Sequence, residues 1–496
     1  HWSVVPYGAA SNLAGESSSR MGLDARVTPS PAMTIDATLH PDFSQIEADV
    51  PQLSVNERFG LFYAEKRPFF LERKDLFDTE LLAVHTRTVT DPSWGARVTG
   101  DVDRTSYTFL VANDRGGGLV LLPGTEVATL APQAFASRVA VGRVRSAVGP
   151  LSAGAVLTDR QVQGGGHNVV LGPDLFWRLG KSDSVTVQYL VSDTRNPLLA
   201  DVDPAWNGSH SRSHAAYAGW AHQSRSWDGG VEGTDIGSGF RADVGFIPQS
   251  GVRERRIDLG YRIWPAKGAL RFLRLGAVYD RVADLAGDTV SRSVYPSVNL
   301  YGLANIDATI DYHGAESVRI EGHTIRQRYL RWTLSGEPSR KFAHVAFSGR
   351  YGELADVANV RSGHGATMTL STTLQPVDSL TAALVLTRRW LDTPSAHERI
   401  FTADARSLRI DWNVTTRVQV RAIAQQVETR SDRRLYRDEI AARDGFHLGS
   451  LLFSYRLSWQ TALYLGYDDR RLVTDDVVGP PDTRKAYVKL SYMFGR

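Results

Sequence analysis

The chain has 496 residues, of which 42% are hydrophobic, and a formal net charge of +3 at pH 7. No stretch approaches the roughly 18–20 consecutive apolar residues of a membrane-spanning helix, which excludes a helical membrane anchor. The sequence contains no cysteine, so disulfides and thiolate metal sites are excluded, and this absence fits a chain that crosses an oxidising periplasm. The net charge is too small to indicate a nucleic-acid partner.

Most of the positive charge comes from arginine. Arginine binds carboxylates and phosphates bidentately, so it suits pore walls and surfaces that face anionic lipopolysaccharide. The alternative interpretation is that the arginines only reflect genomic base composition. The chain starts at His1 without an initiator methionine or a signal peptide, so we expect that something upstream was removed or left out.

From residue 21 onward, apolar and polar residues alternate with a period of two, which is typical of strands with one face against lipid. A soluble β-sandwich also alternates, but it does not usually sustain about twenty such strands with aromatic residues at their ends. The apolar faces recur as Met21, Leu23, Ala25 and Val27; Val185, Val187, Tyr189 and Val191; Leu408, Ile410, Trp412 and Val414; and Leu451, Phe453, Tyr455 and Leu457. The aromatic residues at strand ends are Trp264, Trp390, Trp459, Tyr467 and Tyr492.

The last predicted strand covers residues 486–494 and ends two residues before the C-terminus. This ending is typical of an outer-membrane β-barrel. We expect the strand to pair with residues 2–9 and so to close the barrel. Its lipid face would carry Ala486, Val488, Leu490, Tyr492 and Phe494, and its inner face Tyr487, Lys489, Ser491 and Met493.

Connection lengths predict an orientation, because such barrels have short periplasmic turns and long external loops. Short turns are predicted at residues 29–31, 101–103, 181–183, 265–268, 336–338, 376–378 and around Thr415. Long external loops are predicted at residues 113–134, 193–209, 236–251, 352–363, 429–445 and 468–483.

The strand count by this pattern is about 25, and an odd number does not suit a single-chain bacterial barrel. The odd count arises at residues 41–79, where the pattern does not show how the chain returns to the wall. Either this segment hides one more strand, or it returns through the lumen without joining the wall. The sequence therefore predicts an all-β protein with one large closed antiparallel transmembrane β-barrel over residues 1–496, of about 26 strands with 24 as the alternative, and with residues 41–79 inside or closing the lumen.

Residues 40–77 carry a motif that resembles the DUF5916 family of outer-membrane proteins, whose members read NPDFSQVEAD and then NxRFxxFFPEKRPFFLEG here. The matching residues are 41–45, 47–49, Asn56, 58–59 and 65–72. A second block, residues 239–248, is similar to that family's GFRADLGFVPR. Departures are His40 in place of Asn, Tyr63 and Ala64 in place of Phe-Pro, and Arg73 in place of Gly.

The resemblance implies an architecture more than an activity. Members have a C-terminal barrel, often preceded by a carbohydrate-binding-module-9-like domain, and this chain has no such domain. It is therefore either barrel-only or the remainder of a longer protein.

The first block gathers charges beside phenylalanines. Because charges do not face lipid cheaply, these side chains must face the lumen or water. One interpretation is a salt-bridged plug that pairs acids such as Glu47, Asp49, Glu57 and Glu65 with wall arginines, and the other is a charged ligand site or gate. The candidate residues for the lumen or plug are Asp42, Gln45, Glu47, Asp49, Asn56, Glu57, Arg58, Glu65, Lys66, Arg67 and Glu72, with Phe240, Arg241 and Asp243 from the second block. We expect Arg67-Pro68 to begin a loop or short strand.

Known catalytic and cofactor motifs are missing from the sequence. There is no HExxH, Walker A or GxSxG pattern, and no cysteine nucleophile. His210 and His214 lie about 13 Å apart if they belong to one strand, which is too far for one metal ion. Asp468, Asp469, Asp475 and Asp476 suit either Ca²⁺ or a solvated loop. We therefore expect no enzyme, no catalytic residues, no cofactor and no metal.

Two functions remain open. The first is a plugged or gated conduit for a solute or polymer in the outer membrane of a Gram-negative bacterium, and the alternative is a sealed barrel that anchors an upstream domain or a partner protein. An outer-membrane hydrolase is a third hypothesis, which the scattered histidines do not support. The expected partners are outer-membrane lipid, lipopolysaccharide and a periplasmic protein or lipoprotein, without nucleic acid.

Overall fold

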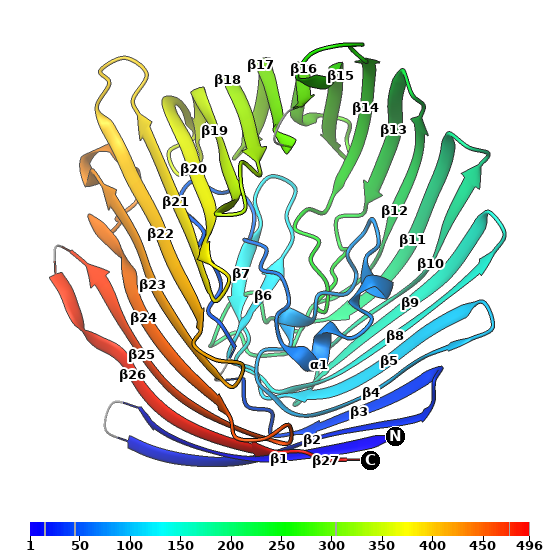
Figure 1. Cartoon of the computed structure of the whole chain (residues 1–496). Coiled ribbons are helices and arrows are strands. Elements are labelled where there is room, and N and C mark those ends of the chain that lie inside the picture. Colours follow the sequence, from blue (N-terminus) through cyan, green and yellow to red (C-terminus); the bar gives the residue numbers. More distant parts are fainter. Residues whose placement is uncertain (14–15, 44–45, 303–304, 476, 496) are drawn as a thin grey trace.

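The strands of this protein form one ring, seen from one end in Figure 1. The structure is a computed structural model that describes all residues except 14–15, 44–45, 303–304, 476 and 496. Within the described residues, one sheet contains 25 strands; one of them is the two-residue β27 (Phe494–Gly495) beside β1, and the other 24 form a closed antiparallel barrel. No helix among the described residues is long and apolar enough to cross a membrane.

The wall strands are, in chain order, β1 (Trp2–Leu13), β2 (Glu16–Ser30), β3 (Met33–Leu39), β4 (Pro92–Val102), β5 (Thr105–Asp114), β8 (Ser137–Val148), β9 (Leu151–Val162), β10 (His167–Leu179), β11 (Asp183–Arg195), β12 (His210–Gln223), β13 (Trp227–Ile236), β14 (Val252–Ile263), β15 (Leu270–Asp284), β16 (Thr289–Gly302), β17 (Asp307–Ile320), β18 (His323–Gly336), β19 (Phe342–Asp356), β20 (Arg361–Val377), β21 (Leu380–Asp392), β22 (Arg399–Asn413), β23 (Val418–Ser431), β24 (Arg443–Arg456), β25 (Thr461–Thr474) and β26 (Val477–Tyr492).

The last and first strands close the barrel, as the sequence predicted. β26 pairs with β1 in an antiparallel register that sets Tyr7 opposite Ser491 and Leu13 opposite Lys485. Val488 and Leu490 are about half exposed on the outer face, whereas Tyr487 and Lys489 are buried on the inner face. The alternation within this strand therefore separates a lipid face from an interior face.

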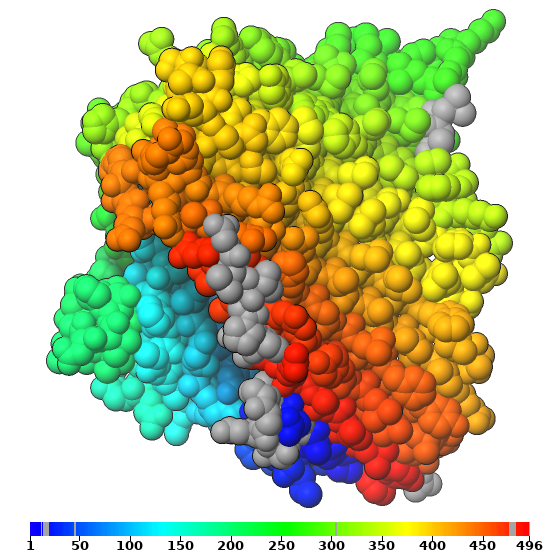
Figure 2. Space-filling view, turned by 90° about the vertical axis from the view of Figure 1, so that its left-hand side faces the viewer, coloured from blue at the N-terminus to red at the C-terminus, as the bar shows by residue number. Residues whose placement is uncertain are grey.

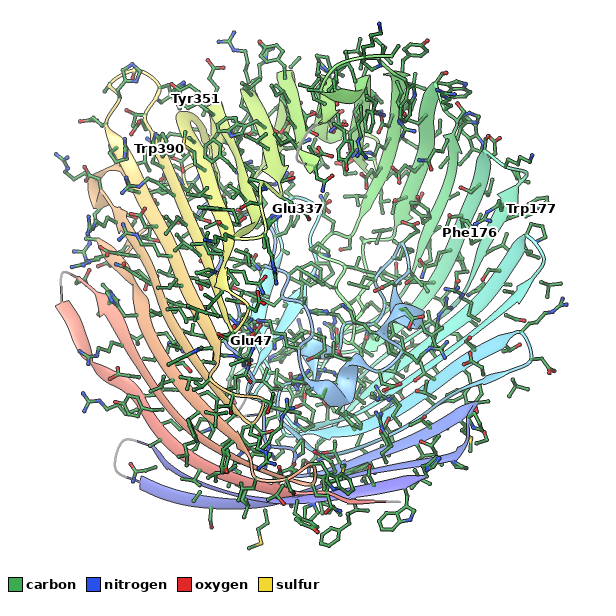
Figure 3. All side chains as sticks on the ribbon, viewed as in Figure 1. Glu47, Phe176, Trp177, Glu337, Tyr351 and Trp390 are labelled. Atoms are coloured by element: carbon green, nitrogen blue, oxygen red, sulfur yellow. The ribbon has the colours of Figure 1, made fainter. Side chains whose placement is uncertain are left out.

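The same alternation runs through the rest of the wall. In β11, Val187, Tyr189 and Val191 are exposed on the outer face, and Gln188 and Leu190 are buried on the inner face. Figure 3 shows Trp177 and Trp390 at the outside of the ring, whereas Glu47 lies within it.

The expectation of about 26 strands is wrong, and the alternative of 24 is confirmed. The described part of residues 40–91, which leaves out 44–45, contains no strand; it forms the short helix α1 (Pro68–Leu71) and the 3₁₀ turns η1 (Lys74–Phe77) and η2 (Thr86–Thr88). The segment leaves and rejoins the wall at the same rim, because β3 and β4 pair directly. The number of strands in the barrel wall is therefore even.

The two rims differ in their connections. One rim has the predicted short turns, such as residues 103–104, 180–182 and 378–379. The other rim, called here the loop rim, has longer connections at 115–136, 196–209, 237–251 and 432–442, the last with the 3₁₀ turn η4 (Arg433–Leu435). Two predicted loops are wrong: 468–483 falls mostly within β25 and β26, and 352–363 shrinks to residues 357–360.

A two-stranded hairpin, β6 (Leu119–Leu122) with β7 (Thr129–Pro132), is not part of the wall. Figure 1 shows this hairpin and α1 inside the ring of strands. Both belong to connections of the loop rim. The hairpin and the segment that carries α1 therefore both enter the ring from the loop rim.

Candidate functional site

The segment between β3 and β4 is held by inward-facing side chains from two sides of the barrel. On one side, Arg389 of β21 donates to Val55 O at 2.6 Å and pairs with Glu57 at 2.6 Å. On the other side, Arg143 of β8 donates to Leu76 O at 2.8 Å. These wall arginines bind backbone carbonyls of the segment and not only its charged side chains. They therefore hold the backbone of the segment in one path.

The predicted residues Glu65 and Arg67 form a buried ion pair with each other, at 2.7 Å. Glu65 Oε1 also accepts from the backbone N–H groups of Lys66 and Arg67, and Arg67 donates to Thr86 O and Val89 O. The expectation that Glu65 lies near a wall arginine is therefore corrected: its cation comes from its own segment. The pair ties α1 to η2, which the sequence alone did not indicate.

The Arg67-Pro68 step is extended at Arg67, as expected, with φ −75° and ψ 123°. The step begins a helix and not a loop or strand, because Pro68 stands at the first position of α1. Proline fits there since its missing N–H has no partner in a helix anyway. The Arg67 guanidinium then covers the Phe70 ring, at 4.3 Å from its centroid.

Three further predicted residues form a charged cluster. Lys66 Nζ lies 3.1 Å from Glu47 and 3.4 Å from Asp49. Glu47 also pairs with Arg409 of β22, and Asp49 pairs with Arg87. Glu47 and Glu57 thus contact wall arginines as expected, whereas the cations beside Asp49 belong to the segment itself.

The remaining candidates of the first block also contact the wall or neighbouring connections. Asp42 lies against Lys489 of β26, whose Nζ donates to its backbone O at 3.0 Å. Asn56 binds the backbone of β19 and the residue after it, and Glu72 pairs with Arg26 of β2 at 2.9 Å. Arg58 donates to Glu126 O at 2.9 Å. Gln45 lies outside the described residues.

The second block lies in the connection between β13 and β14. Arg241 and Asp243 pair at 2.6 Å, and Asn168 of β10 binds the backbone of both residues. Phe240 is only 1% exposed and belongs to the main hydrophobic cluster. The pair therefore holds the loop in shape while Phe240 anchors it.

The two blocks meet each other. His85 N donates to Val244 O at 2.5 Å, and Phe246 N donates to Leu82 O at 2.8 Å. A Cβ at Gly245 would lie 2.5 Å from Leu82 O, so only glycine allows this approach of the two backbones. A contact with residues 82–85, which follow the first motif in the same segment, thus explains the glycine of the second motif.

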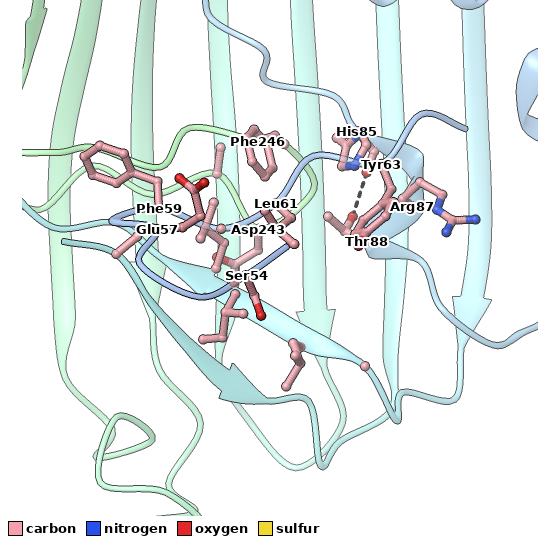
Figure 4. A pocket seen from close by; sticks show the side chains of 18 of the residues that line it. Ser54, Glu57, Phe59, Leu61, Tyr63, His85, Arg87, Thr88, Asp243 and Phe246 are labelled. Atoms are coloured by element: carbon pink, nitrogen blue, oxygen red, sulfur yellow. Dashed lines mark hydrogen bonds between the residues drawn. The ribbon is translucent and has the colours of Figure 1, made fainter. Parts of the chain in front are cut away.

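A cavity of about 660 Å³ lies where these blocks meet the β6–β7 hairpin. Its apolar lining includes Phe59, Leu61 and Phe246, and its polar lining includes Arg87 and Asp243 (Figure 4). This volume is in the range that holds a small organic molecule. Apolar walls with a few polar groups are typical of such sites.

Burial shifts the pKa of two groups beside this cavity. Burial lowers the pKa of His85 to about 4, so the ring is neutral at pH 7. Burial alone would raise the pKa of Glu65, but hydrogen bonds from Arg67 and Thr86 and the charge of Arg67 outweigh it and lower the pKa to about 2. A neutral histidine and an ionised glutamate therefore belong to the native arrangement.

A second cavity, of about 420 Å³, lies between the segment and the inner faces of β14–β19. Its lining is polar and carries both charges, with Arg256, Arg331, Glu254 and Asp280 from the wall and Arg58 from the segment. Beside this cavity, Leu53 of the segment packs with Tyr329 of β18 and Leu354 of β19 in a smaller hydrophobic cluster.

The inner faces of β5 and β8–β13 carry a buried apolar cluster among polar residues such as Arg143 and Asn168, and the sequence analysis missed this cluster. Leu110, Val141, Val170 and Leu190 face inward and form one hydrophobic cluster with Phe70 of α1. The signal was present, because short stretches of these strands are apolar on both faces, as in Phe109-Leu110-Val111. Such a run indicates that something covers the inner face.

One group of residues could hold a metal ion. Within the described residues, only His167, Asp193 and His210 place three ligand atoms within 4.8 Å of one another. Arg212 already pairs with Asp193 at 2.5 Å, and its positive charge weakens the attraction for a cation. His214, which the sequence analysis places too far from His210 to share a metal ion, lies 3.4 Å from Asp235.

The fold and these contacts define a class: a large closed β-barrel of the outer-membrane type. A family model described as "Domain of unknown function (DUF5916)" matches residues 3–97, which include β1–β3 and the first block. The resemblance seen in the sequence is thereby confirmed for that part of the chain. No curated protein matches.

Solved structures share the architecture. A mutant ferric enterobactin receptor (PfeA) from Pseudomonas aeruginosa, in complex with enterobactin, is similar with a TM-score of 0.50 and 10% identity over 99% of this chain and 81% of that chain. The siderophore receptor PirA from Acinetobacter baumannii has a TM-score of 0.48 and 9% identity over 99% and 80%. At these identities the likeness concerns the fold alone.

Proposed function

We propose that this protein is a conduit in the outer membrane of a Gram-negative bacterium, with its lumen constricted by residues 41–79. The observation that carries the proposal is the difference between the two halves of the inner wall. The larger buried apolar cluster packs the segment against the inner faces of β5 and β8–β13, while the mostly polar inner faces of β14–β19 line a cavity of about 420 Å³. The solute would pass along this polar side.

The chemistry of that side suits a small polar solute. Arg256 of β14 lies 3.4 Å from Asp280 of β15, and Arg331 of β18 lies 2.6 Å from Asp311 of β17, so the passage offers both donors and acceptors. Rings of charged side chains are a common basis of selectivity in channels. The same fold serves a receptor in Pseudomonas aeruginosa, which is compatible with a role in passage and not in catalysis.

A sealed platform is the second candidate, and the hydrophobic packing of the segment favours it. Phe70, Phe77 and Leu81 are each at most 6% exposed against the wall. A segment fixed in this way does not leave the barrel easily, because each buried side chain contributes roughly 1.5–3 kcal/mol. A barrel of this kind would anchor an upstream domain or a partner and conduct nothing.

Conductance of the purified barrel in planar bilayers separates the two functions. The double variant Glu57→Gln/Arg389→Gln removes the ion pair that ties the tip of the segment to β21 without leaving a buried charge. A conduit should show low or flickering conductance that rises several-fold in the variant. The matched control is Arg340→Gln, whose exposed pair with Asp378 lies at the rim of the short turns.

Heat-modifiable migration on gels establishes that both proteins are folded barrels. If wild type and double variant are folded and neither conducts, the conduit is refuted and the platform stands. If wild type already conducts like an unobstructed pore of this diameter, the constriction by residues 41–79 is refuted instead.

A further inference from the structure

The outer surface of the barrel is chemically asymmetric between its two rims. Outward-facing residues near the short turns include a set of aromatic residues, whereas those near the loop rim combine arginines with aromatic residues such as Trp94 and Tyr351. The aromatic set at the short turns is Trp2, Trp177, Trp227, Tyr261, Trp412 and Tyr492. The arginine set is Arg212, Arg253, Arg388, Arg430 and Arg471 near the loop rim, with Arg406 at the middle of β22. An aromatic girdle suits a phospholipid leaflet, and an arginine belt suits a leaflet of phosphorylated lipid.

Two arginines of this set stand in one row with Gln426 and His447 across adjacent strands. Arg406 of β22 is opposite Gln426 of β23, Gln426 is opposite His447 of β24, and His447 is opposite Arg471 of β25. Because they are register partners, their side chains leave the same face of the sheet about 5 Å apart from one strand to the next. Each of them carries at least one hydrogen-bond donor.

The donors of this row are not fully used within the protein. His447 Nε2 is shielded from solvent and has no hydrogen-bond partner. The contacts of Arg406 are long, at 3.5 Å to Gln426 and 3.9 Å to Asp404. Arg471 pairs with Asp469 at 3.1 Å. In the tautomer that carries the proton on Nε2, the shielded N–H lacks a partner, which is costly, and a bound oxyanion would remove that cost.

The next row of register partners toward the short turns runs from Leu408 through small residues and ends at Asp469, the partner of Arg471. Leu408 is opposite Ala424, Ala424 is opposite Gly449, and an added Cβ at Gly449 would meet no atom within 4 Å. With Leu384 and Leu386 these residues line a groove of about 720 Å³ that also reaches the arginine row. Figure 2 shows the outer face of these yellow-to-red strands.

We propose that this groove binds lipid A, the phosphorylated glycolipid anchor of lipopolysaccharide. The row Arg406–Gln426–His447–Arg471 holds a phosphate group, and one acyl chain lies along Leu386, Leu408, Ala424 and Gly449. Positive charge above an apolar trough matches a lipid with a phosphate at the top of its chains. The proposal needs the outer-membrane location but is independent of whether the barrel conducts.

Native mass spectrometry of the intact barrel in mild detergent, titrated with purified lipid A, tests the site. Arg406→Gln/Arg471→Gln should weaken lipid A binding roughly 30-fold, as expected for two charges at an anionic lipid. Ala424→Leu/Gly449→Leu fills the groove without changing charge and should weaken binding roughly tenfold or more. The control with the same loss of charge is Arg340→Gln/Arg417→Gln at the opposite rim, which should bind as wild type does.

Heat-modifiable migration on gels again identifies the variants that are folded. If Arg406→Gln/Arg471→Gln does not fold, the variant Ala424→Leu/Gly449→Leu still tests the site. Saturable binding that both groove variants weaken supports the site. The proposal is overturned if wild type binds no lipid A saturably, if a folded groove variant binds it equally well, or if phosphatidylglycerol binds as tightly as lipid A.

Discussion

Phe62 and Phe246 lie edge to face, with ring centroids 5.3 Å apart and ring planes at 75°. One ring belongs to the first family block and the other to the second. The His85 ring packs on Phe62 at 4.7 Å and completes the group. These contacts and the backbone hydrogen bonds nearby make one unit of two distant stretches of sequence, and the 660 Å³ cavity is formed against that unit.

Replacing Phe246 by alanine should loosen this unit. The variant loses the edge-to-face contact and part of the apolar burial, at a cost of about 1–3 kcal/mol. Amide hydrogen exchange at residues 82–85 should become roughly ten- to hundredfold faster. The control is Phe342→Ala, because Phe342 is 52% exposed on the wall. Unchanged exchange at residues 82–85 would show that the backbone hydrogen bonds alone join the blocks.

Replacing Glu65 by glutamine should unfold the segment locally while the barrel survives. Arg67 would remain buried without its counter-charge, and breaking one partner of a buried pair costs about 3–5 kcal/mol. Limited proteolysis should then cut within residues 40–91, and the barrel should still migrate as a folded species. Asp75→Asn is the control, since Asp75 is 68% exposed and 3.8 Å from Arg73. Resistance to proteolysis equal to that of wild type would contradict the role of the pair.

The segment should also loosen in mild acid. The pKa of His85 is lowered to about 4 in the folded protein, so its contribution to stability is complete above about pH 6.5, the ordinary pKa, and falls as pH decreases toward 4. Hydrogen exchange of residues 82–88, corrected for intrinsic rates, should rise by up to tenfold per pH unit in this range.

His85→Gln should abolish this rise between pH 6.5 and 4, because glutamine does not titrate there. Glu65 contributes only at lower pH, since its pKa of about 2 lies below its ordinary value near 4.5 and its stabilisation is lost between these two values. A rise that persists in the His85→Gln variant would assign the pH dependence to another group.

The loop rim should face the cell exterior. An epitope tag in the connection 432–442 should be labelled on intact cells, and a tag in the turn at 378–379 only after permeabilisation. The reason is that long connections lie on the external side of such barrels and that outward arginines near the same rim would face the anionic lipopolysaccharide of the outer leaflet. Labelling of both tags on intact cells would indicate a damaged membrane, and the reverse pattern would invert the orientation.

The sequence by itself determined the wall of this protein. A period of two places Val488 and Leu490 outward and Lys489 inward whatever their neighbours are, because successive side chains of a strand point to opposite faces. It likewise fixed the closure of β26 on β1 and the positions of most short turns. Arg388 and Arg389 show the same rule, since one pairs with Asp404 outside and the other with Glu57 inside.

Only the tertiary structure decided what fills the ring and how charges find their partners. Residues 40–91 show no regular alternation of apolar and polar residues that predicts their structure. Their path depends instead on contacts with the inner faces of β4, β8, β21 and β23. The strand count depended on this path, since a hidden strand and a returning segment look alike in the sequence. The partner of Glu65 was undetermined for a similar reason: many arginines are available, and only packing selects Arg67.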